Sequence, residues 1–209
     1  MKSGDQMSEI DMSGYEKRTF EKKRKVMDAT FDLLNTDIGV KGLTMEEIAE
    51  KSKVSKTSIF KYFGDKDTLI NEVYKDYLDK IGNETQAIID QNLPFEETLI
   101  TMTQNELEHL RKVSKQFYLD MMAFVTERND EGLTVIMREY SNKSFSIMLD
   151  IFHRGRKEGK VDLKYSDEFL LVFFQAMIEG ISSPQIYNRI LPYTMEWTEL
   201  LIKGVAPKK

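Results

Sequence analysis

The sequence contains no cysteine, which excludes a disulfide framework, thiol catalysis and any cysteine-ligated metal site. Only four prolines and eleven glycines occur in 209 residues, and this scarcity favours long helices over a turn-rich sandwich. Long hydrophobic runs are missing as well, since the longest apolar stretch without charge, residues 169–178, is too short to span a bilayer. Residues 1–20 lack the apolar core of a signal peptide. We therefore expect a soluble cytoplasmic protein with no membrane contact.

Histidine is rare too, because His109 and His153 are the only two and fall in different predicted helices. Neither has a pair of carboxylates nearby at metal-ligand spacing. The sequence also carries no phosphate-binding loop and no nucleophile elbow. We therefore expect no metal site, no cofactor and no catalytic residue, and we do not expect an enzyme.

Helical spacing of apolar residues runs through the chain, and no stretch shows sustained alternation of apolar and polar residues. The predicted fold class is therefore all-α. After a disordered tail at residues 1–14, we expect a first helix from Tyr15. A linking helix is expected at 65–81, ending at Gly82-Asn83. Further helices are expected at 95–110, 115–126, 131–157, 167–182 and 195–204.

Residues 43–69 have the pattern of a helix-turn-helix, two short helices joined by a tight turn. Thr44 and Glu47 form a capping box for the first short helix, and Ser55 is an N-cap for the second. Gly64 stops the second helix, and Asp65 caps the linking helix. We expect Phe60 and Phe63 to pack in the core of this domain, which spans residues 15–64.

Charge is divided unevenly along the chain, whose net charge is −5. Residues 15–66 hold 12 Lys and Arg against 9 Asp and Glu, whereas residues 67–209 carry a net charge of −6. The first helix bears a basic cluster of Lys17, Arg18 and residues 22–25. Such a run is often only a solvated face, but directly before a helix-turn-helix it also suits phosphate contacts. The asymmetry predicts two functional regions, with the basic one meeting DNA.

The segments 43–49, 54–63 and 65–69 resemble the DNA-binding domain of the TetR family of bacterial transcriptional regulators. Ser52 and Lys53 stand in the turn where that family tends to have Ala and Gly, so Lys53 is expected to need a positive φ. Thr57 and Phe60 replace the commoner Gly and Tyr. The resemblance covers residues 15–80, and the rest of the chain shares only the family's helical pattern.

The resemblance implies an interface with double-stranded DNA in which a recognition helix enters the major groove. Thr44 would bind a phosphate at a helix N-terminus, and Lys66 would add positive charge nearby. The start of the recognition helix would face base edges, and its later residues would hold the backbone. The implied DNA-binding residues are Thr44, Ser55, Lys56, Thr57, Ser58, Lys61, Tyr62 and Lys66.

Family members act as two-fold dimers, so the resemblance also implies a homodimer through the last two helices, 167–182 and 195–204. The first of these is apolar on nearly every face, which suits either a dimer interface or a helix buried within a monomer. Residues 82–209 would form the effector-binding and dimerisation domain. Its many Met and aromatic residues are either core or the wall of a cavity for a small apolar effector. The candidate wall residues are Met102, Phe117, Met121, Phe124, Phe145, Met148, Phe152, Phe174 and Met177.

Two functions follow from these observations. The first is a repressor that a small apolar ligand releases from a near-palindromic operator. The second is a DNA-binding protein whose C-terminal domain recruits a protein partner and holds no effector, which would have a filled core and an exposed apolar patch away from the dimer face.

Overall fold

The computed structural model describes the backbone of residues 13–126, 128–129, 132–133, 135–182, 186 and 189–208. It describes the side chains of residues 13–124, 142–180, 186 and 189–208. The chain divides into two compact units with a boundary between Leu78 and Asp79. Most of the predicted tail lies outside the described residues. Its last two residues are instead ordered at the start of the first helix: Ser13 is the N-cap and forms a capping box with Glu16, and the helix begins at Gly14.

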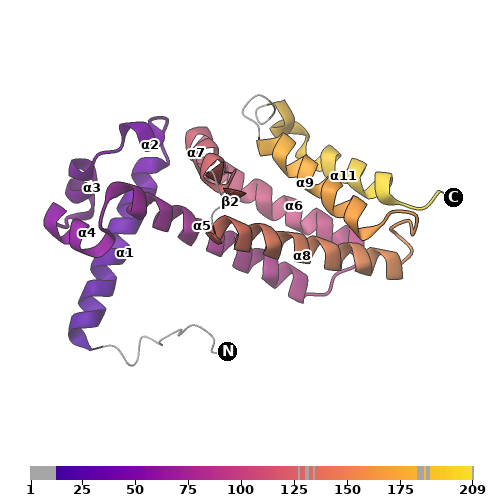
Figure 1. Ribbon diagram of the computed structural model, residues 1–209, viewed down its shortest axis with the longest axis horizontal. Coiled ribbons are helices and arrows are strands. Elements are labelled where there is room, and N and C mark those ends of the chain that lie inside the picture. Colours follow the sequence, from indigo (N-terminus) through magenta and orange to yellow (C-terminus); the bar gives the residue numbers. More distant parts are fainter. Residues whose placement is uncertain are drawn as a thin grey trace. The chain divides into compact units, whose positions relative to one another are not determined.

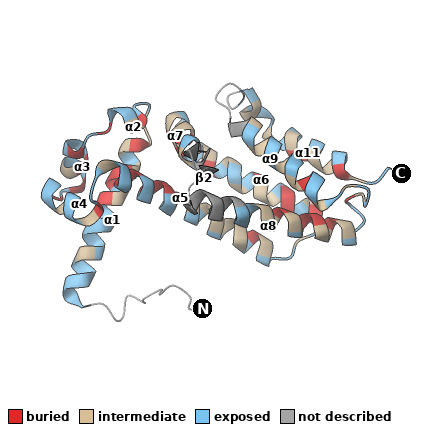
Figure 2. Ribbon diagram, viewed as in Figure 1, coloured by how far each residue is buried: buried red, intermediate tan, exposed pale blue. Residues whose placement is uncertain are grey.

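The N-terminal unit contains α1 (Gly14–Leu34), α2 (Gly39–Gly42), α3 (Met45–Ser52), α4 (Lys56–Phe63) and the first part of α5 (Lys66–Asp90) (Figure 1). Helix α1 is exposed along its first half and buried only in its second (Figure 2). Val26 and Leu34 of α1 pack in the core with Ile48 of α3 and Ile59 of α4, and all four are fully buried. This core fixes the two short helices of the motif.

Helix α5 is longer than the sequence indicated, because it does not end at Gly82-Asn83 but continues to Asp90. Glycine inside a helix costs about 0.5–1 kcal/mol, which the burial of residues beyond it offsets. Ile88 is 7% exposed, and Glu84 binds the buried His109. The helix therefore begins in the N-terminal unit and ends in the C-terminal one.

The C-terminal unit is helical in its described residues apart from one short hairpin (Figure 1). Helices α6 (Phe95–Lys112) and α7 (Lys115–Thr126) precede two antiparallel two-residue strands, β1 (Arg128–Asn129) and β2 (Gly132–Leu133). Helices α8 (Val135–Lys157), α9 (Asp167–Ser182), η1 (Leu191–Tyr193) and α11 (Thr194–Val205) follow. The helix predicted at 131–157 thus starts four residues later, after the hairpin. None of the described helices has both the length and the apolar content that a membrane span requires.

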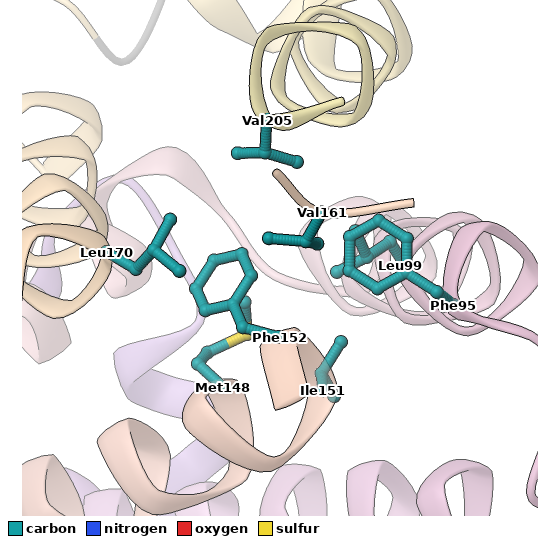
Figure 3. Close-up of a cluster of buried hydrophobic side chains, with 8 residues drawn as sticks. All are labelled: Phe95, Leu99, Met148, Ile151, Phe152, Val161, Leu170 and Val205. Atoms are coloured by element: carbon teal, nitrogen blue, oxygen red, sulfur yellow. The ribbon is translucent and has the colours of Figure 1, made fainter. Parts of the chain in front are cut away.

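The core of this unit gathers side chains from segments far apart in the sequence (Figure 3). Figure 3 shows Val161, from the link between α8 and α9, between the ring of Phe152 and the side chains of α6, with Val205 of α11 beyond it. Gly155 allows this approach, because a Cβ there would lie 2.6 Å from Val161 Cγ2 and 2.7 Å from Phe95 Cδ2. The buried cluster comprises Phe95, Leu99, Met148, Ile151, Phe152, Val161, Leu170 and Val205.

Candidate nucleic-acid interface

The N-terminus of α3 is held by the predicted capping box. The Thr44 hydroxyl accepts a hydrogen bond from the Glu47 N–H at 3.2 Å, and the Thr44 N–H donates to Glu47 Oε2 at 2.9 Å. The Thr44 hydroxyl also donates to the same carboxylate at 2.7 Å, and these bonds lower the pKa of Glu47. The backbone N–H groups of Thr44 and Glu47, which have no partner within the helix, are thereby hydrogen-bonded, and this fixes the residue at which α3 starts.

The turn between α3 and α4 adopts the conformation expected from its unusual residues. Lys53 is left-handed, with φ 56° and ψ 31°, which confirms the predicted positive φ. Ser52 is buried, and its hydroxyl accepts a hydrogen bond from the Val54 N–H at 3.3 Å. This side-chain bond closes the turn, while Lys53 bears the backbone strain that glycine would avoid.

Helix α4 begins and ends as its sequence predicted. The Ser55 hydroxyl accepts from the Ser58 N–H at 3.3 Å, and Gly64 ends the helix with φ 82°. Ile59 and Phe63 are buried, but Phe60 is 45% exposed, so its predicted place in the core was wrong. One helical step from Ile59 turns Phe60 by about 100° onto the outer face. The exposed face of α4 consists of Lys56, Thr57, Phe60 and Lys61.

Two lysines of the predicted interface are engaged within the chain. The Lys56 ammonium binds Glu46, the second residue of α3, and this hydrogen bond lowers the pKa of Glu46. Both side chains remain exposed, so the pair is open to exchange for a phosphate. The half-buried Lys66 donates to the Leu43 carbonyl at 3.0 Å, which ties the start of α5 to the entry of α3. Lys66 therefore stabilises the fold of the N-terminal unit, and its contact with a DNA phosphate stays a prediction.

The linking helix is capped as expected. Asp65 accepts a hydrogen bond from the Thr68 N–H at 2.7 Å, and this bond lowers the pKa of its carboxyl. The cap places a helix N-terminus directly after α4, next to Lys66. Helix N-termini and cations both favour bound phosphate.

The basic cluster of α1 separates into two roles, a division that the charge pattern alone did not reveal. Arg24 binds Asp28 at 3.0 Å and reaches Asp76 of α5 at 2.9 Å. Lys23 lies over the Phe63 ring, with its ammonium 5.7 Å from the ring centre. These two cations join α1 to α5 and α4. Arg24 and Asp76 are 52 residues apart, so no local sequence pattern could predict their ion pair.

All six side chains of the cluster are exposed, and the four besides Lys23 and Arg24 are Lys17, Arg18, Lys22 and Lys25. They keep the basic character of α1 at the surface. A phosphate-contacting role for them therefore stays a prediction.

The N-terminal motif matches a known family. Residues 26–73 match the model for bacterial regulatory proteins of the tetR family, a span that covers the helix-turn-helix just described. Residues 26–73 therefore form a DNA-binding domain of the TetR family. The chain is a DNA-binding transcriptional regulator of the helix-turn-helix class, as the sequence predicted.

Full-length relatives share this organisation at low identity. The HTH-type transcriptional regulator YvkB of Bacillus subtilis is 23% identical over 197 residues, covering 88% of this chain and 96% of that protein. A TetR transcription regulator from Haloarcula marismortui has a TM-score of 0.73 at 14% identity, covering 90% of this chain and 100% of that one. FadR from Bacillus subtilis, solved in complex with stearoyl-CoA, has a TM-score of 0.68 at 16% identity, covering 87% and 98%. The TetR-like fold therefore extends over both units.

The predicted effector-wall residues separate into three groups. Met148 and Phe152 are buried in the core cluster, and Met102 and Phe174 pack against it. Phe145 meets Phe174 edge to face, with ring centres 6.3 Å apart. The remaining residues lie on other parts of α7 and α9: Phe117 and Met121 are buried, and Phe124 and Met177 are half-buried.

A separate surface hollow of about 640 Å³ lies near η1. Its lining residues are Ile186, Arg189, Ile190, Pro192 and Tyr193, none of which was predicted. Among the side chains that the structure describes, no group of three or more His, Asp or Glu is arranged to hold a metal ion.

Proposed function

We propose that this protein is a cytoplasmic repressor that binds a near-palindromic operator as a homodimer and is released by a small, largely apolar effector. In this proposal residues 15–64 read DNA, residues 65–81 link, and residues 82–209 bind the effector and the second subunit. The observation that carries the proposal is the exposed basic face of α4, a helix that starts at the side-chain cap of Ser55 and ends at Gly64. A rigid helix with exposed lysines suits insertion into the major groove.

The proposed DNA contacts follow from position and exposure. Lys56, Thr57 and Lys61 are exposed on α4, and Ser55 and Ser58 form its N-terminal cap. Thr44 stands at the N-terminus of α3, a position that favours a bound phosphate. The half-buried Tyr62 and Lys66 would contact the backbone at the edge of the interface.

The proposed dimer interface is an apolar patch on α9 and α11. Phe169, Val172 and Phe173 are 51%, 60% and 38% exposed on α9, at spacings that place them on one face. Leu200 of α11 is 67% exposed. The Phe169 and Phe173 rings are stacked, with centres 6.2 Å apart. Exposed aromatic residues ordered in this way mark an interaction surface.

The proposed effector response depends on α5, which is one continuous helix from the cap at Asp65 to Asp90. A ligand that favours one arrangement of the C-terminal unit can act on the DNA reader through this helix. A hundredfold loss of DNA occupancy requires the ligand to favour the non-binding state by about 2.7 kcal/mol. Stearoyl-CoA, which FadR from Bacillus subtilis binds, shows that a TetR-like fold of this length accommodates a long apolar chain in that protein.

The DNA-binding proposal is tested with oligonucleotides selected from a random pool by the full-length protein. We expect a near-palindromic sequence, and an affinity that falls steeply with salt. Lys61→Ala should weaken binding about tenfold and reduce the salt slope by about two per dimer. Lys80→Ala, which removes an exposed lysine from the second half of α5, is the control and should change neither. Unchanged affinity of Lys61→Ala and Lys56→Ala would refute the assignment of α4 as the reader.

The dimer proposal is tested by size-exclusion chromatography with light scattering. Val172→Glu and Leu200→Glu should give monomers and lower the operator affinity at least about a hundredfold, because the two readers no longer act together. Leu163→Glu, at a residue that is 79% exposed in the link between α8 and α9, should remain a dimer. Dimers of wild-type mass in both α9 and α11 variants would exclude this interface.

A further inference from the structure

A carboxylate occupies a core position of α6. Phe95, Leu99, Met102, Glu106 and His109 follow one another at spacings of four, three, four and three residues, which place them on a single helix face. Phe95, Leu99 and His109 are at most 4% exposed. Glu106 lies on the same face as these buried residues, although its own side chain is exposed to solvent.

Glu106 is accessible to water and yet closely flanked by protein. Burial raises the pKa of its carboxyl, while the nearby charge of His109 lowers it by a smaller amount. A side chain that is both accessible and desolvated lines a hollow between helices and does not face bulk water. The exposure and the desolvation of this side chain together indicate such a hollow beside Glu106.

The imidazole of His109 acts on Glu106 from a distance but forms no ion pair with it. His109 Nε2 lies 2.6 Å from Glu84 Oε2, so the imidazole is already engaged with another carboxylate. Within the described side chains, Glu106 makes no hydrogen bond and no ion pair. An unpaired interior carboxylate is costly, and a guest that supplies positive charge recovers that cost.

The facing helix α11 brings a second unpaired polar group to the same region. Thr103 Oγ1 and Thr198 Oγ1 are hydrogen-bonded at 2.7 Å, and Val205 packs in the cluster with Phe95, so α6 and α11 run antiparallel. Glu106 lies three residues beyond Thr103, and Trp197 one residue before Thr198, so their levels differ by about 3 Å along the helices. Trp197 also lies one turn before Leu201, which packs against the core, so both side chains are on the core side.

Trp197 Nε1 is buried and has no acceptor. A buried donor left unpaired is unfavourable, because it has lost its water and gained no acceptor. Its indole ring is also the aromatic surface that attracts cations most strongly. An unpaired carboxylate and an aromatic ring at one level indicate a cationic guest between α6 and α11.

The rest of this region is apolar. Met102, one turn before Glu106, is half-buried and packs against the core cluster, as does Phe174. Gly155 of α8 faces Phe95 of α6. Phe145 lies ten residues before Gly155 on α8, and Glu106 lies eleven residues after Phe95 on α6. Because the Phe95 N–H donates to Glu158 at the end of α8, α6 and α8 are antiparallel, and Phe145 falls near the level of Glu106.

We propose that the effector site takes an amphipathic cation, whose protonated amine pairs with Glu106 while its apolar body lies against Met102, Phe145 and Phe174. This inference rests on the proposed effector site and gives it a chemical class. A hydrogen bond to a charged group contributes about 1.5–3 kcal/mol, so loss of the carboxylate lowers affinity for the cation about tenfold to a hundredfold.

The test uses three probes with the same apolar chain: decylammonium, 1-decanol and decanoate, each below its micelle-forming concentration. Trp197 is the only tryptophan of the protein, so its fluorescence reports occupancy of this region in the full-length chain. Wild type should bind decylammonium most tightly and decanoate most weakly. Glu106→Gln should lose about tenfold or more in affinity for decylammonium and keep its affinity for decanol within about twofold. Glu108→Gln, an exposed position of α6, should behave as wild type.

Equal binding of decylammonium by wild type and Glu106→Gln, or no binding of decylammonium by a folded wild type, would overturn this inference. The outcomes also separate it from the proposed function. Glu106-dependent binding that leaves operator affinity unchanged supports the cation site and refutes the effector role. Release of the operator by decanol and decylammonium alike, in both wild type and Glu106→Gln, supports the effector role and refutes the cation site.

Discussion

Replacing Lys53 by glycine should stabilise the helix-turn-helix, because glycine relieves backbone strain at this position. Lys53 holds a left-handed backbone, with φ 56° and ψ 31°, at the end of α3. A side chain in this conformation costs about 1–2 kcal/mol relative to glycine. Glycine loses about 0.5–1 kcal/mol more conformational entropy on folding. The difference predicts a net stabilisation of about 0.5–1 kcal/mol for Lys53→Gly.

Two other variants isolate the backbone effect from the loss of charge. Lys53→Ala removes the same ammonium group but keeps a Cβ, so it should bring no stabilisation. Asn92, at φ 53°, is the other residue besides glycine with a positive φ in the described chain. Asn92→Gly should stabilise less than Lys53→Gly, because asparagine tolerates this conformation better than lysine does.

Thermal unfolding followed by far-UV circular dichroism measures the effect in the full-length protein. A gain of this size should raise Tm by about 1–4 °C, since 1 kcal/mol corresponds to about 2–4 °C for chains of this length. Hydrogen exchange should show slower exchange in α3 and α4, which localises the gain to the N-terminal unit. If Lys53→Gly is no more stable than Lys53→Ala, strain at this turn is not the cause.

Four further predictions concern single positions. Thr44→Ala should cost about 1 kcal/mol in urea unfolding through loss of the cap, and Thr44→Ser should restore most of it. Glu46→Gln should release Lys56 and tighten operator binding a few-fold at low salt but not at high salt, measured by fluorescence anisotropy. Gly155→Ala should cost about 1–3 kcal/mol in urea unfolding, because its Cβ meets two buried side chains. Glu106 binds its proton more tightly in the folded than in the unfolded chain, so wild type loses stability as pH rises above 4.5. Glu106→Gln should therefore exceed wild type in Tm at neutral pH and converge with it below pH 4.5, as scanning calorimetry can show.

Local chemistry made much of the DNA-binding unit predictable. The caps at Thr44, Ser55 and Asp65 each depend on a side chain within three residues of its backbone partner. The left-handed Lys53 follows from a turn whose geometry is set by the two helices it joins. Such features are visible in a short stretch of sequence because no distant residue takes part in them.

Distant packing decided what the sequence did not reveal. Phe60 follows a buried isoleucine and precedes a buried phenylalanine, and only the direction of α4 against α1 shows that it faces outward. Helix α5 passes through Gly82 because Glu84 binds His109, further along the chain, and Ile88 is buried. Arg24 likewise finds Asp76 of α5 only after folding. The unpaired state of Glu106 also depends on which helices surround it.

The length of α5 sets a mechanical scale for the protein. Its 25 residues form a rod of about 37 Å, so a tilt of about 5° at one end displaces the other by about 3 Å. That displacement is comparable to a hydrogen-bond length, and bonds to a DNA base are lost over such a distance. In the proposed repressor, small rearrangements in the C-terminal unit are therefore large enough to change contacts at the operator. Gly82 lies within α5, so flexibility at this residue would reduce the displacement that the helix transmits.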